Sequence, residues 1–166
     1  MTLDRLWAGW RVDYVASADE AAADGCVLCR ILSSDEPDEE TYVVWRGERT
    51  AVVLNAYPYG SGHVMVLPQR HVADLGELDD AESAELWRTA ITAVAAIRAA
   101  YSPGGVNLGA NLGRAAGAGV PGHLHLHCLP RWEGDTNFMT SVAEVRVLPE
   151  ALPTTWHKLR EAWPAS

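Results

Sequence analysis

Residues 122–132 read GHLHLHCLPRW, and histidine occupies every second position from His123 to His127. Successive side chains of a β-strand point to opposite faces of a sheet, so the pattern predicts a strand with His123, His125 and His127 on one face. The leucines between them and Cys128 then face the core, where Cys128 is a small packing residue. Three aligned imidazoles bring together groups that accept, donate and relay protons near neutral pH, which indicates a chemical site. A metal ion bound by the three rings is the alternative interpretation.

A loop rich in glycine and alanine, residues 113–122, comes directly before these histidines. Glycine allows the main chain to approach a ligand closely, and main-chain N–H groups in such loops bind phosphate oxygens. An imidazole whose second nitrogen is held by an acceptor is a good nucleophile toward phosphorus. The loop lacks the lysine and hydroxyl pair of a P-loop, and the neighbouring sequence offers no carboxylates for Mg²⁺. Developing charge would therefore rest on histidines and N–H donors.

Length and composition limit the classes of function. The 166 residues (18.0 kDa) fit one domain, and 48% hydrophobic with 21% charged residues is ordinary globular usage, which excludes disordered and fibrous classes. A formal charge of −9 argues against nucleic acid as a partner, because such binding depends on neutralising many phosphates. No apolar run is long enough to span a membrane, and the first residues lack a secretory signal pattern, so we expect a cytoplasmic protein.

The carboxylates are unevenly distributed along the chain. None lies in residues 50–73 or 86–132, and these two segments hold five of the six histidines. Local binding of an anion is one explanation for this distribution. Exclusion of carboxylates from apolar strands is the other, and the sequence leaves both open.

Five strands and two helices are expected along the chain. A helix-start pair, Asp79 and Glu82, precedes apolar residues at helical spacing, and residues 102–105 (SPGG) end this long helix. A shorter amphipathic helix is expected around residues 156–163. Because the long helix separates the third strand from the fourth, the pattern predicts an α+β fold with a largely antiparallel sheet. The expected strands cover residues 41–46, 50–55, 63–67, 106–112 and 123–129.

The motif HLHLHCL at residues 123–129 resembles the signature of the histidine triad (HIT) superfamily. The segments LNAYPYGSGHVMVLPQRH at residues 54–71 and NLGANLG at residues 107–113 are similar to those that precede this signature in the family. The resemblance implies a HIT-like fold with a five-stranded, mainly antiparallel sheet, one long helix and a C-terminal helix. It also implies a homodimer in which two such sheets join.

The resemblance covers residues 26–138, which we expect to form the HIT core of a single domain. Residues 1–25 then form an N-terminal extension, and residues 139–166 form a C-terminal tail with its helix. Two further segments, LWAGWR at residues 6–11 and RWEGDTNF at residues 131–138, resemble the bacterial branch that includes diadenosine tetraphosphate phosphorylases.

The chemistry of the family, transferred by position, implies that His125 attacks the α-phosphorus of a nucleotide and becomes covalently nucleotidylated. Water, phosphate or another acceptor then releases the nucleotide. His127 would contact the phosphate and handle protons, and His63 would support the triad by hydrogen bonding. Asn55 matches a group that binds the ribose hydroxyls, and Asn111 matches a phosphate-contacting asparagine. From the residues alone, Asn55 could instead form a turn before a proline and Asn111 could close the end of a strand.

The glycine-rich loop departs from the family pattern at one place. The family commonly has Gln or Ser three or four residues before the first histidine, whereas this chain has Gly119 and Val120. The leaving group would then be bound or protonated by a different donor, which leaves the substrate preference open. The expected nucleotide contacts in this loop are main-chain groups of Gly117 and Gly119.

The function implied is that of a nucleotide hydrolase or transferase, which cleaves dinucleoside polyphosphates of the diadenosine tetraphosphate type without an organic cofactor. Phosphorolysis and hydrolysis both remain open. Three alternatives are a purine nucleoside phosphoramidase with the same nucleophile, a nucleotide-binding protein with slow turnover, and metal storage or sensing through the histidine strand.

The pair Cys26-x-x-Cys29 has the spacing of half a zinc site. A tetrahedral site needs two more ligands, and the resemblance supplies His71 and His123, positions that complete a Cys₂His₂ site in several HIT proteins. Four protein ligands leave no open coordination position, so the implied Zn²⁺ would be structural. A redox-active dithiol and two buried, inert cysteines are the alternatives.

Overall fold

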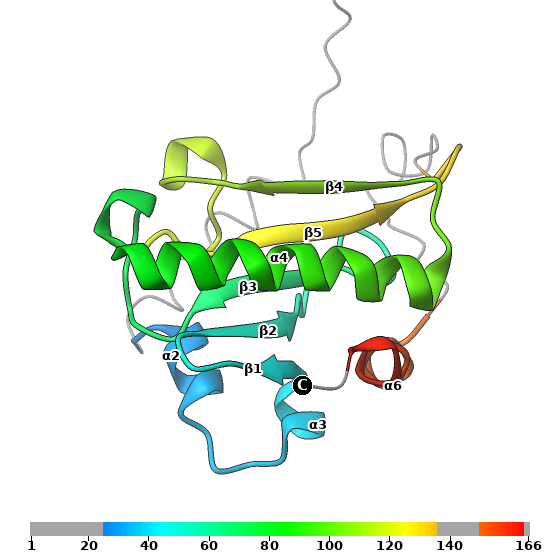
Figure 1. Ribbon diagram of the computed structural model, residues 1–166, viewed down its shortest axis with the longest axis horizontal. Helices are drawn as coiled ribbons and strands as arrows, with labels where there is room; N and C mark the ends of the chain where they lie inside the picture. Colours follow the sequence, from blue (N-terminus) through cyan, green and yellow to red (C-terminus); the bar gives the residue numbers. More distant parts are fainter. Residues whose placement is uncertain (1–24, 136–149, 165–166) are drawn as a thin grey trace, which may run out of the picture.

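The computed structural model describes residues 25–135 and 150–164 of the chain. Figure 1 shows one β-sheet with the long helix α4 lying across it and the short helices α2, α3 and α6 near β1. All neighbouring strands are antiparallel, in the order β1-β2-β3-β5-β4, which confirms the α+β fold expected from the sequence. The strands are β1 (Val43–Arg46), β2 (Thr50–Leu54), β3 (Val64–Pro68), β4 (Gly105–Ala110) and β5 (Leu126–Arg131), and the short helical elements are α2 (Val27–Leu32), α3 (Asp38–Thr41), η1 (Leu75–Glu77) and η2 (Arg114–Ala116).

Helix α4 (Asp80–Tyr101) connects β3 to β4 across the sheet. It begins with a capping box, in which the Asp79 side chain accepts the main-chain N–H of Glu82 and the Glu82 side chain accepts that of Asp79. It ends where Ser102 adopts a left-handed conformation with a φ of 45°. Its apolar stripe packs against the sheet, and Leu86 is completely buried there. The long helix predicted from residue spacing is therefore confirmed.

The sheet carries an apolar core on each face. The larger core lies between the sheet and α4 and includes Leu124, Leu126 and Cys128, which confirms that these three residues face the interior. In the smaller core, Leu28 of α2 packs against buried side chains of β1, β2 and β3. The two cores together hold the sheet between α2 and α4.

The C-terminal helix α6 (Leu152–Ala162) lies beside β1 and is the amphipathic helix that the sequence predicted. Trp156 donates its Nε1–H to the carbonyl of Val43 over 2.9 Å, and Arg160 donates to the carbonyl of Val44 over 2.6 Å. The register of the β1–β2 ladder shifts at this point. The helix therefore supplies donors to carbonyls at an irregular place in the strand.

Strand β5 begins three residues later than the sequence predicted. The carbonyl of Pro68 on β3 accepts the ring Nε2–H of His123 over 2.9 Å, in place of a main-chain N–H from the neighbouring strand. The N–H of Leu124 donates instead to the carbonyl of Val72 over 2.6 Å. The predicted strand start at His123 is therefore wrong, and of the three motif histidines His127 alone lies on β5.

None of the helices in the described part of the chain is long and apolar enough to cross a membrane. Residues 1–24, most of the expected N-terminal extension, and residues 136–149 lie outside the described residues. The expected boundaries of the HIT core stay predictions.

Candidate active site and metal centre

His125 lies immediately before β5 and is buried, with 5% of its surface exposed. Its ring Nδ1 lies 2.7 Å from the main-chain carbonyl oxygen of His123. Because a carbonyl oxygen can only accept, Nδ1 carries the proton and the lone pair is on Nε2. Burial lowers the pKa of His125, and the hydrogen bond to the His123 carbonyl opposes this effect. The neutral ring therefore has its lone pair on one defined nitrogen, as a nucleophile requires.

A chain of hydrogen bonds fixes the tautomers of His63 and His127. The main-chain N–H of Tyr59 donates to His63 Nδ1 over 3.1 Å, so His63 carries its proton on Nε2. That nitrogen donates to His127 Nδ1 over 2.9 Å, which leaves the proton of His127 on its own Nε2. Burial, together with the neighbouring His125, lowers the pKa of His127 to about 4. His127 is therefore a neutral ring with an N–H to donate, beside His125.

The imidazole rings form one compact cluster. The ring centroids of His125 and His127 are 4.9 Å apart with nearly perpendicular planes, and those of His63 and His127 are 5.1 Å apart. The ring of Tyr59 packs at 4.7 Å from His63 and 5.8 Å from His127. The structure thus brings together His63, His125 and His127, the three histidines to which the family resemblance assigned catalytic roles. It adds Tyr59, which the sequence analysis missed because its contribution is a main-chain N–H.

Asn55 and Asn111 each have a structural partner. The Asn55 side-chain oxygen accepts the main-chain N–H of Tyr57 over 2.9 Å, which closes a turn. Asn111 Nδ2 donates to the carbonyl of Gly117 over 3.4 Å and holds the glycine-rich loop to the end of β4. Gly117 has a φ of 90°, a conformation that favours glycine. These contacts are the turn and strand-end roles left open by the sequence, and binding of a nucleotide by either asparagine stays a prediction.

The glycine-rich loop offers main-chain groups at the position where the family pattern has Gln or Ser. The side chain of Val120 packs against the smaller core, next to residues of α2. Gly119 has no side chain, and Ala118 before it is buried. Neither Gly119 nor Val120 therefore supplies a side-chain donor to a leaving group.

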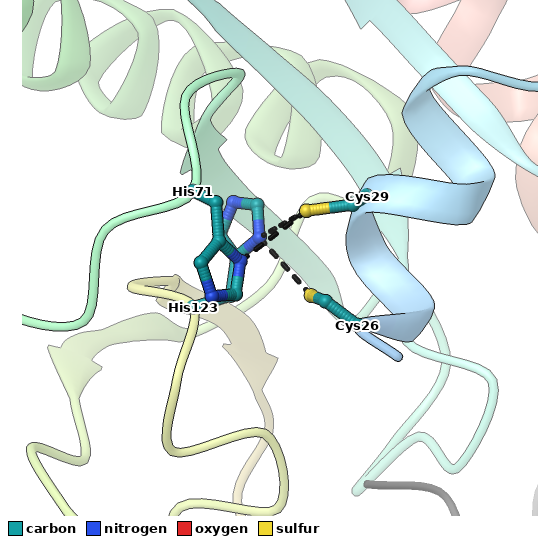
Figure 2. Close-up of side chains that lie close together, drawn as sticks. All are labelled: Cys26, Cys29, His71 and His123. Carbon is teal, nitrogen blue, oxygen red and sulfur yellow. Dashed lines mark hydrogen bonds between the residues drawn. The ribbon is translucent and has the colours of Figure 1, made fainter. Parts of the chain in front are cut away.

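The second cluster joins Cys26, Cys29, His71 and His123, whose ligand atoms all lie within 4.8 Å of one another. Figure 2 shows both imidazoles facing the two sulfurs on α2 and the residue before it. The sulfur of Cys26 is 3.3 Å from His123 Nδ1, and that of Cys29 is 3.3 Å from His71 Nδ1 and 3.4 Å from His123 Nδ1. A sulfur and a nitrogen bound to one tetrahedral Zn²⁺ stand about 3.5 Å apart. The four predicted ligands are therefore brought together, and they fit a metal ion.

Groups behind the two histidine ligands hold them in place. His123 donates its Nε2–H to the carbonyl of Pro68, which leaves Nδ1 without a proton and directed at the sulfurs. Arg70, next to His71, donates to both carboxylate oxygens of Glu82 over 2.8 and 2.7 Å. This ion pair lowers the pKa of Glu82 to about 2 and ties the loop with His71 to the first turn of α4.

The two metal interpretations are distinguished by the geometry. Within residues 25–135 and 150–164, the Cys₂His₂ cluster is the one group of three or more histidines, cysteines and carboxylates placed to share a metal ion. It includes His123 but neither His125 nor His127. The geometry therefore supports a Cys₂His₂ centre and gives no support to a site made of the three motif histidines.

Residues 36–134 match the family model described as the HIT domain, and the chain belongs to the HIT family. Among curated relatives, it is similar to an AP-4-A phosphorylase of Mycobacterium tuberculosis. The two sequences are 40% identical over 167 aligned residues, which cover 97% of this chain and 85% of the relative.

Two solved structures share the fold. A Zn-bound histidine triad family protein from Mycobacterium smegmatis is 28% identical with a TM-score of 0.68, and the match covers 85% of this chain and 94% of that one. A hypothetical histidine triad nucleotide-binding protein from Sulfolobus tokodaii is 31% identical with a TM-score of 0.67, over 82% and 91% of the two chains. These structures confirm the HIT-like fold. The family match and the phosphorylase relative confirm the prediction of a HIT-family enzyme.

Proposed function

We propose that the protein transfers a nucleotidyl group from a dinucleoside polyphosphate of the diadenosine tetraphosphate type through a covalent bond to His125 Nε2. The observation that carries the proposal is the 2.7 Å hydrogen bond from His125 Nδ1 to the carbonyl of His123. It puts the lone pair on Nε2 and stabilises the positive charge that the ring acquires when Nε2 bonds to phosphorus. The 40% identity to an AP-4-A phosphorylase supports the choice of substrate.

In the first step, the lone pair of His125 Nε2 attacks the α-phosphorus. The bond between that phosphorus and its bridging oxygen breaks, and the leaving nucleoside polyphosphate takes the electron pair. In the second step, an oxygen of the acceptor attacks the same phosphorus. The P–N bond breaks, and its electron pair returns to Nε2.

The groups around His125 bind charge and orient the nucleotide. The Nε2–H of His127 donates to a phosphate oxygen, and His63 keeps His127 in the tautomer that can donate. Main-chain N–H groups of the glycine-rich loop bind the remaining phosphate oxygens. The binding residues that we assign are Asn55 for the ribose and Asn111, Gly117 and Gly119 for the phosphates.

We propose orthophosphate as the acceptor, because the similar mycobacterial protein is named a phosphorylase. Phosphorolysis of diadenosine tetraphosphate yields ADP and ATP, whereas hydrolysis through the same intermediate yields AMP and ATP. The test is incubation of the protein with diadenosine tetraphosphate, with and without phosphate, followed by chromatographic separation of the products. ADP that forms only with phosphate supports the proposal.

Two other product patterns would contradict it. AMP and ATP formed at the same rate with and without phosphate would make water the acceptor. AMP released from an adenosine phosphoramidate, with no cleavage of the tetraphosphate, would favour the phosphoramidase. The His125→Ala variant is the negative control for every substrate.

We also propose that Cys26, Cys29, His71 and His123 hold a structural Zn²⁺. The sulfur–nitrogen distances of 3.3–3.4 Å support this, as does the similarity to a Zn-bound family member. With four protein ligands, the ion supplies links between α2 and the two histidine segments and has no open position for substrate.

Elemental analysis of untagged protein tests the zinc proposal. We expect about one zinc per chain, and much less in Cys29→Ser. The matched control is Cys128→Ala, which removes a cysteine of the apolar core. Metal-free protein with full stability and activity would reject the proposal, and a reversible disulfide between Cys26 and Cys29 would favour the dithiol interpretation.

We propose a second copy of this chain as the partner of β4. Among the strands of the described residues, β4 lies at the edge of the sheet and pairs only with β5. Leu108 is 43% exposed and stands opposite Cys128, on the α4 side of the sheet. On α4, Trp87 and Ile91 are 50% and 68% exposed. All three residues belong to the segment 86–132, which has no carboxylate, so two copies of an acidic chain can approach along this segment without repulsion between carboxylates.

A further inference from the structure

One peptide unit connects the metal centre to the nucleophile. It consists of the carbonyl of His123 and the N–H of Leu124. The carbonyl accepts the Nδ1–H of His125 over 2.7 Å, and the N–H donates to the carbonyl of Val72 over 2.6 Å. A rotation of this peptide plane would break the hydrogen bond that sets the tautomer of His125.

Two contacts of that peptide unit adjoin the metal centre. The side chain of His123 is itself a candidate ligand and is 1% exposed, and Val72 follows directly after the ligand His71. The rings of His71 and His123 meet edge to face with 5.2 Å between centroids. Cys26 and Cys29 connect this pair of rings to α2 (Figure 2).

The β-ladder does not extend to this peptide unit. The pairing of β3 with β5 joins Val64 to Cys128 at one end and Val66 to Leu126 at the other, and it stops there. The carbonyl of His123 therefore lies beyond the last ladder pair. The ring of His123, the hydrogen bond to Val72 and a 3.3 Å hydrogen bond from the His123 N–H to the carbonyl of Val120 hold it in place. A filled metal centre would fix the first two of these contacts.

We infer that His123 is a positioning residue: coordination of its side chain fixes the peptide unit that sets the tautomer of His125, so the metal centre controls the nucleophile without touching the substrate. This inference rests on the proposed function. When the centre is filled, His125 keeps its lone pair on Nε2. When the centre is empty, His125 exchanges between its two neutral tautomers, and the form protonated on Nε2 cannot attack phosphorus.

A matched pair of variants at His71 tests the inference, because this ligand is exposed. His71→Ala leaves three ligands, whereas His71→Cys keeps four, since cysteine also binds Zn²⁺. In His71→Ala we expect loss of zinc and a fall of about 10- to 100-fold in the rate of nucleotidylation of His125 by diadenosine tetraphosphate, as is typical when groups around a metal site are removed. Affinity for AMP, measured by calorimetry, should stay unchanged.

His71→Cys should retain both zinc and the rate of nucleotidylation, which rapid quenching measures. His157→Ala, at an exposed histidine of α6, is the control for loss of a histidine as such. If His71→Ala loses zinc but keeps the wild-type rate, the inference is wrong. If it loses AMP affinity together with the rate, the centre maintains the fold and the inference is also wrong.

Nitrogen-15 NMR of the histidine rings reads the tautomers without reference to activity. In zinc-loaded wild-type protein, His125 should show one tautomer protonated on Nδ1, and removal of zinc with a chelator should produce a mixture. A single unchanged tautomer in the zinc-free protein would contradict the inference. A zinc-loaded wild-type protein that never becomes nucleotidylated would contradict the proposed function instead.

Discussion

His63 and His127 share a hydrogen bond of 2.9 Å between His63 Nε2 and His127 Nδ1, and the main chain fixes its direction. The N–H of Tyr59 occupies the other nitrogen of His63, so the shared proton belongs to His63 Nε2. His127 consequently keeps its own proton on Nε2. The carbonyl of His123 fixes the neighbouring His125 in the opposite tautomer. Two adjacent imidazoles are therefore held in different tautomers, which suit the proposed roles of His125 as the nucleophile and His127 as a donor.

Replacement of His63 tests this arrangement. We expect His63→Leu to lower kcat by about 10²-fold, because His127 Nδ1 loses its donor and the proton on Nε2 is no longer fixed. His63→Gln should lose less, since an amide can accept from Tyr59 and donate to His127. Steady-state kinetics with diadenosine tetraphosphate measure both variants, and circular dichroism confirms that they fold. If His63→Leu has the kcat of the wild-type protein, the hydrogen bond from His63 to His127 does not contribute to turnover.

Burial gives His127 a specific response to acid. Its pKa is lowered from 6.5 to about 4, so between these values the unfolded chain binds a proton at His127 and the folded protein does not. The contribution of His127 to the free energy of unfolding is therefore complete above pH 6.5 and declines as the pH falls toward about 4. An NMR titration of the folded protein should find the ring still unprotonated at about pH 5. A midpoint near 6.5 would contradict the burial argument.

Two side chains of α6 stabilise the irregular part of β1. Trp156→Phe removes the donor to the carbonyl of Val43, and Arg160→Met removes the donor to that of Val44. We expect each variant to lower the free energy of unfolding by about 1–3 kcal/mol, because a carbonyl loses its partner. The exposed neighbour Glu161→Gln is the control and should change it by less than about 0.5 kcal/mol. If denaturant titrations give the same free energy of unfolding for all three variants, these two hydrogen bonds do not contribute to stability.

The edge strand β4 gives a prediction about assembly. We expect wild-type protein to sediment as a dimer and Leu108→Asp to sediment as a monomer, because the substitution puts a charge on each copy at the proposed interface. Leu75→Asp is a matched control, since Leu75 is 39% exposed and belongs to η1, outside β4 and α4. Analytical ultracentrifugation measures the masses. A monomeric wild-type protein, or a dimer that persists in Leu108→Asp, would contradict the proposed partner.

The fold was predictable where local signals agree with tertiary packing. Asp79 and Glu82 form the capping box that the sequence indicated, and the apolar spacing after them matches the buried stripe of α4. Alternation placed Leu126 and Cys128 in the core. The same alternation predicted a strand start at His123 that the structure does not have. The carbonyl of Pro68 accepts from the ring of His123, where a main-chain N–H of a neighbouring strand would otherwise donate.

The site was predictable in its residue types but less so in its connections. Cys26 and His123 are 97 positions apart, and spacing alone identified half of their cluster, whereas the family resemblance identified the other half. The bond from Trp156 to Val43 spans 113 positions and has no local signal. The N–H of Tyr59 fixes a tautomer through the main chain, which every residue except proline can do, so the residue type does not reveal it.

The covalent bond between His125 and a nucleotide is the most direct test of the whole account. Protein mixed with diadenosine tetraphosphate, quenched within one turnover under alkaline conditions that preserve phosphohistidine, and digested for mass spectrometry should show a nucleotidyl group on the peptide that contains His125. The same peptide from His125→Ala should remain unmodified. A wild-type peptide that stays unmodified while turnover is rapid would contradict the assignment of His125 as the nucleophile.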